Sequence, residues 1–386
     1  MPARVLQTGA ISGGSSDDRL LRKTTVAPGV RRGSVQLSGR IQHEAGRYAP
    51  THASVERGTL TTGKYRFRAD LSRTSAGPGE GNVVIAREIP LDGLRGEMRQ
   101  QEPMSGHNSW RAGGVASRYV RPADLADLCA LMRQLPSHEP LLWIGLGSNL
   151  LVRDGGFAGT VIATQGMNAI SQIDVGRFRI EAGAACNKIA RVTARAGCVG
   201  AEFLAGIPGT LGGALAMNAG AFGGETWPLV SAVETIDRHG EIHRRDAKEF
   251  EFGYRHVDGP MDAGFVACEL SLPKGDTEAA QTTIRALLAR RNATQPTGLP
   301  SCGSVFRNPE GDHAARLIEA AGLKGRCRGA ACVSEKHANF IINTAGSDGD
   351  ARANDIEDLL NEVRDTVRAQ FGIELWPEVR IVGDRS

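Results

Sequence analysis

Aromatic side chains are scarce in this chain of 386 residues, at 5% of the total. Proteins that stack single-stranded nucleic acid need aromatic platforms, so the composition argues against that partner. The net charge of +3 is also small, and its basic excess lies within residues 1–92, which leaves a weakly acidic remainder. Because nucleic acid attracts strongly basic surfaces, we expect no nucleic-acid partner.

Paired cysteine motifs are absent as well. The seven cysteines are scattered with no C-x-x-C spacing, which argues against a zinc ribbon or a thioredoxin-type motif. The nine histidines show no ligand spacing with cysteine or acidic partners, so we expect no metal site. Free thiols in a reducing compartment are the simplest interpretation of the cysteines.

No apolar run approaches the roughly 20 residues that a membrane helix needs. The first 14 residues also lack an apolar run of signal-peptide length. We therefore expect no membrane span and a cytoplasmic location.

A chain of this length exceeds one ordinary hydrophobic core, so we expect two or three domains. Residues 1–90 are rich in Gly, Ser, Thr and Arg, with only short possible strands at 64–69 and 82–86. We predict that residues 1–90 are a disordered or non-native extension. A basic tail that contacts a partner is the alternative.

Periodic segments begin near residue 89. Apolar spacing predicts helices at 122–135, 187–196, 314–321 and 356–371, the last two closed by Gly322 and Gly372. Alternation and short apolar runs predict strands at 141–144, 160–164, 177–182, 231–237, 241–244, 264–272, 338–343 and 374–382. The long C-terminal helix with few strands indicates a separate α+β domain from about residue 285.

Two glycine-rich segments could hold a ligand by its phosphates. Residues 143–151 read Trp-Ile-Gly-Leu-Gly-Ser-Asn-Leu-Leu, and residues 206–214 read Gly-Ile-Pro-Gly-Thr-Leu-Gly-Gly-Ala, followed by Met-Asn-Ala-Gly-Ala at 217–221. Backbone amides in such turns can surround a diphosphate without a lysine. The first segment is neither a dinucleotide fingerprint, because Leu150 replaces the third glycine, nor an NTPase phosphate loop. A plain tight turn and close helix–sheet packing are the alternatives.

Together these motifs resemble the UDP-N-acetylenolpyruvoylglucosamine reductase family, also called UDP-N-acetylmuramate dehydrogenases. The resemblance continues in order through 252–255 (Phe-Gly-Tyr-Arg), 303–309 (Gly-Ser-Val-Phe-Arg-Asn-Pro), 322–325, 333–340 and 377–380 (Pro-Glu-Val-Arg). It covers about residues 91–384, whereas residues 1–90 match nothing in the family.

The resemblance implies an α+β protein in two folded parts. Residues 91–280 would form an FAD-binding fold of the vanillyl-alcohol-oxidase (PCMH) type in two subdomains, and residues 285–386 a C-terminal substrate-binding domain. It implies FAD and NADPH as cofactors, and NADPH-dependent reduction of enolpyruvyl-UDP-GlcNAc, a UDP-sugar, to UDP-N-acetylmuramate in peptidoglycan and cell-wall synthesis. In such an enzyme the cofactor carries the difficult chemistry and the protein orients it. We expect a monomer.

The resemblance also assigns roles to single residues. Arg255 would hold the substrate carboxylate, Glu378 would stabilise the charge that develops there, and Ser304 would donate a proton. Without the family, Ser304 is typical of a turn and the two charged residues of a surface. The expected cofactor-binding residues are Gly145, Gly147, Ser148, Asn149, Leu150, Gly206, Ile207, Gly209, Gly212, Gly213, Asn218 and Gly220. The expected substrate-binding residues are Tyr254, Asn308, His337 and Arg380.

This chain departs from the family pattern at two places. Val257 stands where the family usually has a serine, two residues after the motif arginine. Few residues separate Arg255 from the strand expected at 264, which indicates the subtype without a long tyrosine-bearing loop. Two other functions stay open: an oxidase of the same fold, which should offer His or Cys for covalent flavin attachment, and a flavin electron-transfer subunit, which should offer a docking surface.

Overall fold

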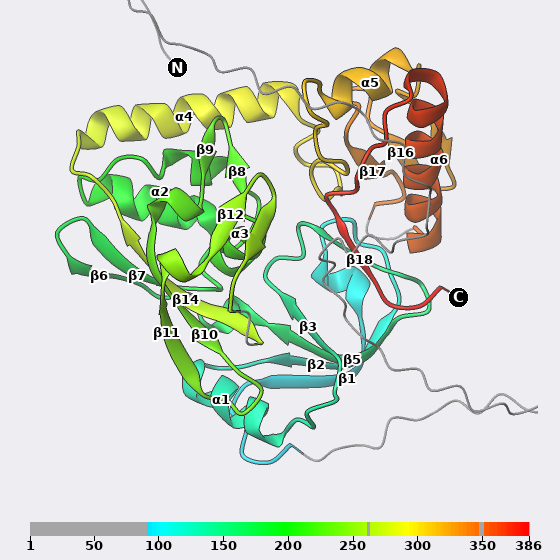
Figure 1. The fold of residues 1–386 in the computed structure, drawn as a ribbon. Helices are drawn as coiled ribbons and strands as arrows, with labels where there is room; N and C mark the ends of the chain where they lie inside the picture. Colours follow the sequence, from blue (N-terminus) through cyan, green and yellow to red (C-terminus); the bar gives the residue numbers. More distant parts are fainter. Residues whose placement is uncertain (1–90, 261–262, 347–350, 386) are drawn as a thin grey trace, which may run out of the picture. The chain divides into compact units, whose positions relative to one another are not determined.

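The computed structural model describes residues 91–260, 263–346 and 351–385 (Figure 1). The chain divides into two units, Met1–Gly79 and Glu80–Ser386, and every described residue belongs to the second. The predictions for residues 1–90, including the two short strands, lie outside the described residues.

A four-stranded sheet follows the start of the described chain. Its order is β1 (Glu97–Pro103), β2 (Val115–Arg121), β5 (Phe157–Ala163) and β3 (Leu141–Ile144). The last three strands are parallel, and α1 (Leu125–Gln134) lies in the connection from β2 to β3. The Asp124 carboxylate accepts the amide of Asp127 at 2.9 Å and so caps the start of α1.

A second, antiparallel sheet has five strands. Their order is β11 (Ile242–Asp246), β10 (Val230–Ile236), β14 (Gly264–Ser271), β7 (Arg177–Glu181) and β6 (Ile170–Asp174). The helices α2 (Cys186–Arg195) and α3 (Leu211–Ala216), the 3-10 turn η3 (Glu202–Gly206) and α4 (Thr277–Thr294) pack on one side of this sheet. Figure 1 shows α2 and α4 on the same side.

The helix α1 joins the two sheets through a shared core. Its Leu128 and Leu131, both fully buried, pack in one cluster with Ile162 of the first sheet and Val266 of the second. Burying each such side chain contributes about 1.5–3 kcal/mol relative to leaving it exposed. The two sheets are therefore held as one body by the amphipathic face predicted at 122–135.

The C-terminal part has its own core. A small sheet of β15 (Cys327–Arg328), β16 (Ala331–Val333) and β17 (Ile341–Asn343) packs with α5 (Ala314–Ala320) and α6 (Ala353–Phe371). The apolar stripe of α6 is buried in that core, and the helix ends at Gly372 in the left-handed conformation, φ 70°. The predicted helices and the Gly372 cap are confirmed, although the strand predicted at 338–343 is shorter.

The C-terminal strand returns to the first part of the chain. β18 (Arg380–Val382) runs parallel to β4 (Leu150–Val152), so the strand predicted at 374–382 is short. Two further pairings are local. One joins β8 (Gly220–Ala221) to β9 (Gly224–Glu225), and the other joins β12 (Glu251–Gly253) to β13 (His256–Asp258) across a two-residue turn.

The sequence analysis does not predict α4, which runs through residue 285. Its Ala280 and Ile284 are buried in the same cluster as Ile189 of α2. We therefore group α4 with the preceding sheet and let the C-terminal part begin after it.

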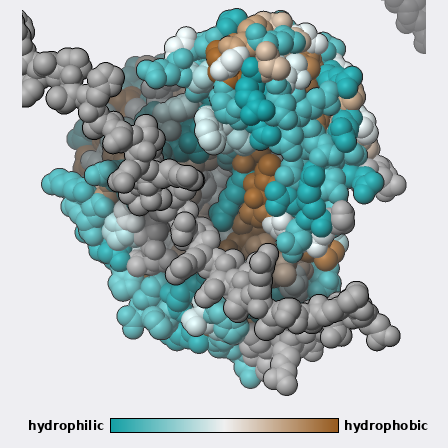
Figure 2. Space-filling view, turned by 45° about the vertical axis from the view of Figure 1, so that its right-hand side comes forward, coloured by the Kyte–Doolittle hydropathy of each residue, from teal (hydrophilic) through white to brown (hydrophobic). Residues whose placement is uncertain are grey.

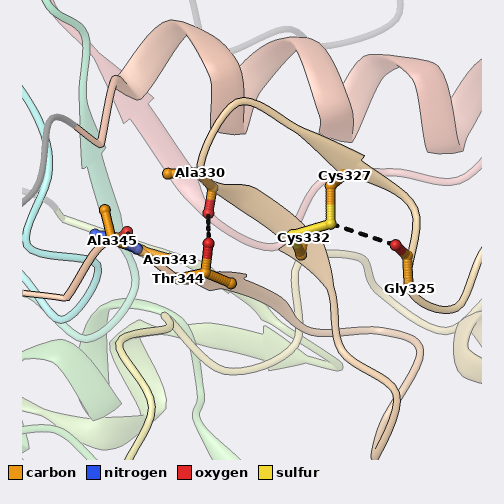
Figure 3. The surroundings of a disulfide bond; sticks show 7 residues. All are labelled: Gly325, Cys327, Ala330, Cys332, Asn343, Thr344 and Ala345. Carbon is orange, nitrogen blue, oxygen red and sulfur yellow. Dashed lines mark hydrogen bonds between the residues drawn. A yellow bond between two sulfur atoms is a disulfide. The ribbon is translucent and has the colours of Figure 1, made fainter.

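One prediction about the cysteines is wrong. Cys327 and Cys332 form a disulfide across β15 and β16 (Figure 3), where the strand register places them opposite each other. The other five cysteines, all within the described residues, are free thiols. The disulfide arises from strand pairing, which cysteine spacing does not reveal.

The visible surface of the described residues is mostly hydrophilic in Figure 2, with a hydrophobic strip in a recess between more polar surfaces. Among the described residues, no helix is long and apolar enough to cross a membrane.

Candidate active site

Two neighbouring cavities, of about 630 and 270 Å³, share much of their lining. The larger cavity is within the roughly 300–1,000 Å³ that small-molecule sites have, and the smaller lies just below that range. The residues common to both are Ser148, Asn149, Ile207, Met217, Ala219 and Glu378. The two glycine-rich segments and the Pro-Glu-Val-Arg segment therefore meet at one place.

The first glycine-rich loop follows β3 and is packed too closely for side chains. A Cβ on Gly147, where φ is +61°, would lie 2.1 Å from the carbonyl oxygen of His107. A Cβ on Gly145 would lie 2.1 Å from the hydroxyl of Thr210 in the second glycine-rich segment. Glycine at these positions lets the two loops approach each other and expose backbone to the cavity.

Several features of the lining fit a phosphate-bearing cofactor such as FAD. The Thr210 hydroxyl is buried without a hydrogen-bond partner, and Thr210 lines the smaller cavity. A Cβ at Gly213 would meet nothing within 4 Å, so open space lies beside that backbone. Glu378 is the sole acidic residue among the residues that line the two cavities. Five arginines line the two cavities: Arg111, Arg255, Arg291, Arg307 and Arg380. An unpaired buried hydroxyl and this surplus of positive charge both suit an anionic ligand.

The position of Glu378 follows from pairing between distant segments. Its amide donates to the carbonyl of Val305 at 2.8 Å, and its carbonyl accepts the side-chain amide of Asn149 at 3.1 Å. The amide of Arg380 then donates to the carbonyl of Asn149 at 3.1 Å. Residues Ser304 and Glu378 are thus brought to the same wall of the larger cavity.

Arg255 forms an ion pair with the predicted catalytic acid. Its Nε donates to Oε1 of Glu378 at 2.7 Å, and its Nη2 donates to the carbonyl of Gly220 at 3.1 Å. Arg255 has φ +54° in the two-residue turn between β12 and β13. Glycine or asparagine is usual at such an angle, and another residue costs on the order of 1–3 kcal/mol. Backbone strain at a residue whose side chain lines a cavity is typical of a functional position.

Burial raises the pKa of Glu378, although the charge of Arg255 acts in the opposite direction. The raised pKa makes the protonated form of this carboxyl group easier to reach than it is for an exposed glutamate. A carboxyl group of this kind, at the wall of a cavity and next to a fixed cation, is typical of a site that stabilises or transfers charge.

Two expected cofactor ligands lie behind the cavity walls. Gly212 packs against Ala182, and neither it nor Asn218 is among the residues lining the two cavities. The fully buried Asn218 side chain donates to Glu225 and to the carbonyl of Gly253. Their direct contact with a cofactor stays a prediction. The other ten expected cofactor-binding residues line one or both cavities.

The expected substrate-binding residues are spread around the site. Tyr254 and Asn308 line a third hollow of about 460 Å³, and the side chain of Asn308 also accepts the amide of Ala314 at the start of α5. Arg380 lines the smaller of the two shared cavities, where burial lowers its pKa. His337 lines none of these cavities; its Nδ1 accepts the amide of Asn339, and burial lowers its pKa.

The sequence analysis does not assign a role to three arginines that line the cavities. Arg111, with φ +57°, and Arg291 line the larger cavity, whereas Arg307 lines the smaller cavity and the third hollow. No carboxylate of the described residues forms an ion pair with any of the three. Arg307 could be found from the Gly-Ser-Val-Phe-Arg-Asn-Pro motif, but Arg111 and Arg291 carry no sequence signal of their own.

A cluster that could hold a metal ion lies at the turn between β10 and β11. Ligand atoms of Asp237, Glu241 and His243 lie within 4.8 Å of one another. The carboxylate of Asp237 is already used by His243, at 3.0 Å, and by the amides of His239 and Glu241. These contacts explain the cluster as the internal bonding of a turn.

Comparison with known proteins identifies the family. Curated UDP-N-acetylenolpyruvoylglucosamine reductases from Alkalilimnicola ehrlichii and Methylococcus capsulatus are 61% and 58% identical to this chain. The matches span 289 and 291 residues, 75% of this chain in both cases, and 96% and 94% of those proteins.

The chain belongs to the UDP-N-acetylenolpyruvoylglucosamine reductase family.

Domain matches agree with the family and with the fold. Residues 295–382 match the C-terminal domain of UDP-N-acetylenolpyruvoylglucosamine reductase, and residues 116–246 match an FAD binding domain. The crystal structure of the reductase from Thermus caldophilus superposes with a TM-score of 0.63 at 31% identity, over 75% of this chain and 99% of that one. The predicted α+β fold, an FAD-binding domain followed by a C-terminal domain, is confirmed.

Val257, the departure from the family pattern, contributes to the hydrophobic core. Val257 is half-buried and packs against the core cluster that contains Trp227 and Phe250. A valine there contributes apolar contact where a serine would bring a hydroxyl.

Proposed function

We propose that this protein catalyses the NADPH-dependent, FAD-mediated reduction of enolpyruvyl-UDP-GlcNAc to UDP-N-acetylmuramate, a step of peptidoglycan synthesis. The observation that carries the proposal is the pair of Arg255 and Glu378 beside Ser304, at the wall of a cavity lined by both glycine-rich loops. Membership of the reductase family supports the same activity.

Bound FAD would accept a hydride from NADPH and pass it to the vinyl group of the substrate. The glycine loops at 145–150 and 206–213 are the parts of this chain that would hold the cofactor, through backbone amides and the buried hydroxyl of Thr210. Arg307 and Arg380 add positive charge to the same wall, which suits a ligand that carries a diphosphate.

Arg255 and Glu378 would act on the substrate carboxylate. When the vinyl group gains a hydride, negative charge moves onto the carboxylate and the adjacent carbon. A guanidinium has five N–H groups. Within the described residues only Nε and Nη2 of Arg255 donate hydrogen bonds, so the remaining N–H groups can donate to that carboxylate. Protonated Glu378 can donate a further hydrogen bond, which stabilises charge that exists only after the transfer.

Ser304 would give a proton to the adjacent carbon. It lines the larger cavity with Arg255 and Glu378, and within the described part of the chain its hydroxyl has no hydrogen-bond partner. Gly303 before it has φ +74°, which turns the chain sharply as it enters the pairing of Val305 with Glu378. An unassisted serine is a weak acid, so the positive charge of Arg255 nearby would favour loss of its proton.

The oligomeric state and location belong to this proposal. We propose that the active form is a monomer. Because NADPH and UDP-sugars are metabolites of the cytoplasm, we place the enzyme there. Light scattering during gel filtration would show whether a single chain carries the activity.

The function is tested by measuring NADPH oxidation and product formation together on the purified yellow protein. NADPH oxidation should require enolpyruvyl-UDP-GlcNAc, and mass spectrometry should find UDP-N-acetylmuramate in equal amount. Steady NADPH oxidation with oxygen alone, at the rate seen with the substrate, would favour an oxidase. No reduction of the flavin by NADPH would favour a non-catalytic flavin protein.

A further inference from the structure

A small hollow of about 160 Å³ lies between α2 and α4, away from the cavities described above. It is lined by two arginines of α2, Arg191 and Arg195, and by Gln281, Ile284 and Arg285 of α4. Ile284 is buried at 5% exposure, and α2 and α4 pack directly against each other, so the base of the hollow is a fixed part of the core.

The three arginines around this hollow have no acidic partner. Within the described residues no carboxylate forms an ion pair with any of them, and the guanidinium of Arg285 bonds only to the hydroxyl of Thr282, at 2.9 Å. More than half of the other arginines described are ion-paired, for example Arg179 with Glu234 and Arg153 with Glu357. The lack of partners at the hollow is therefore unusual for this molecule.

The spacing of the arginines makes the arrangement unfavourable without a ligand. Arg191 and Arg195 are four residues apart on α2 and so lie on the same helix face, where like charges destabilise a helix. Arg285 brings a third positive charge to the same hollow from α4. An anion between the three would turn this repulsion into attraction.

We propose that the α2–α4 hollow binds the phosphate groups of a phosphorylated small molecule. Guanidinium groups match phosphate oxygens through paired hydrogen bonds, and the Gln281 amide supplies a further donor. The volume is below the roughly 300–1,000 Å³ of sites that enclose a whole small molecule, so only the phosphate end is held. No aromatic residue lines the hollow, which disfavours a single-stranded nucleic acid as the ligand.

The probe is inorganic pyrophosphate, titrated into the FAD-loaded protein by calorimetry at constant ionic strength. We expect the double variant Arg191→Gln/Arg195→Gln to bind pyrophosphate at least tenfold more weakly at one site than the wild type. The control Arg133→Gln/Arg352→Gln removes the same charge from exposed arginines elsewhere and should bind as the wild type does. Any pyrophosphate that enters the active-site cavities is common to all three proteins and cancels in the comparison.

Parallel titrations separate the sources of phosphate. Binding of inorganic phosphate as tight as that of pyrophosphate would assign the site to a single phosphate group, whereas tighter pyrophosphate or nucleoside triphosphate binding assigns it to a chain of phosphates. The proposal is wrong if the Arg133→Gln/Arg352→Gln control loses pyrophosphate binding to the same extent as the double variant, or if the wild type binds no pyrophosphate at millimolar concentration. It is also wrong if a DNA duplex is the only ligand that binds and the double variant abolishes that binding. Circular dichroism of each variant verifies that the overall helix content is unchanged.

Discussion

Glu378→Gln tests whether the carboxyl group, rather than the strand that carries it, is used in the reaction. Glutamine has nearly the same shape, and the backbone bonds of residue 378 to Val305 and Asn149 do not depend on the side chain. The substitution removes the carboxyl group opposite Arg255, both its negative charge and its ability to take up and give a proton.

The expected loss of rate in Glu378→Gln follows from the contacts of the carboxyl group. Arg255 keeps a neutral acceptor in the glutamine oxygen, so the loss is that of a charge-assisted hydrogen bond and of one group aimed at developing charge. Removing one such group typically costs about 10²–10³ in rate, or about 2.7–4 kcal/mol. This loss should appear only where charge develops on the substrate. Reduction of the flavin by NADPH should therefore keep close to the wild-type rate.

Stopped-flow absorbance of the flavin resolves the two half-reactions. Glu362→Gln is the matched control, because Glu362 on α6 also pairs with an arginine, Arg326, but lines none of the cavities described above. The control should leave both half-reactions unchanged. Equal slowing of both half-reactions in Glu378→Gln would refute the reasoning, since it would make the residue a structural support of the cofactor site.

Three further outcomes are expected. Ser304→Ala should slow reoxidation by substrate by about 10²–10⁴-fold, the usual effect of losing a positioned proton donor, and should spare flavin reduction in the same stopped-flow assay. Acid precipitation should release all FAD into the supernatant, because the described residues of the cavities offer no reactive cysteine to bind the flavin covalently. Cys302 is the single cysteine among the described residues that line the two cavities, and burial raises its pKa to about 12, which makes it a poor nucleophile. Yellow colour left in the pellet would contradict this prediction. Glu357→Gln should destabilise the fold by about 1–3 kcal/mol at pH 7 in urea titrations, because Arg153 binds that carboxylate with two hydrogen bonds. The Arg153 bond lowers the pKa of Glu357, so its stabilisation is present above the ordinary value of 4.5, and the difference from wild type should shrink as the pH falls below it.

The glycine loops could be predicted because their requirement is local. At Gly145 and Gly147 a Cβ would lie 2.1 Å from another segment of the same chain, so only glycine fits at these single positions. The long helix α6 could be predicted for a similar reason, since its buried side chains recur at helical spacing.

The helix α4 could not be predicted, because little of it is buried. Over 18 residues only Ala280 and Ile284 are buried, so the apolar stripe that marks most helices is missing. The edge strand β1 is missed for the same reason: its sequence Glu-Met-Arg-Gln-Gln-Glu-Pro is almost wholly polar and mostly exposed. Both elements are set by neighbours that lie elsewhere in the sequence.

Arg111 and Arg291 could not be assigned to the site from their surroundings in the sequence. Each reaches the larger cavity only once β1, β2 and α4 are in place, and arginine alone does not distinguish a surface from a cavity. The disulfide between Cys327 and Cys332 is likewise a consequence of strand register. Pairings of this kind depend on tertiary structure, which residue spacing does not encode.

Asn149 shows why the cofactor loop and the catalytic acid must be considered together. Its side-chain amide donates to the backbone carbonyl of Glu378 at 3.1 Å and approaches the sulfur of Met217, next to the second glycine-rich segment, at 3.4 Å. Its own carbonyl accepts the amide of Arg380 and so begins the parallel pairing of β18 with β4. One residue of the first loop thus joins three segments that lie far apart in the sequence. Because the same residue positions the loop and the acid, a shift of the cofactor site would displace Glu378 as well, which explains how a carboxylate 229 residues away is held in register with the glycine loop.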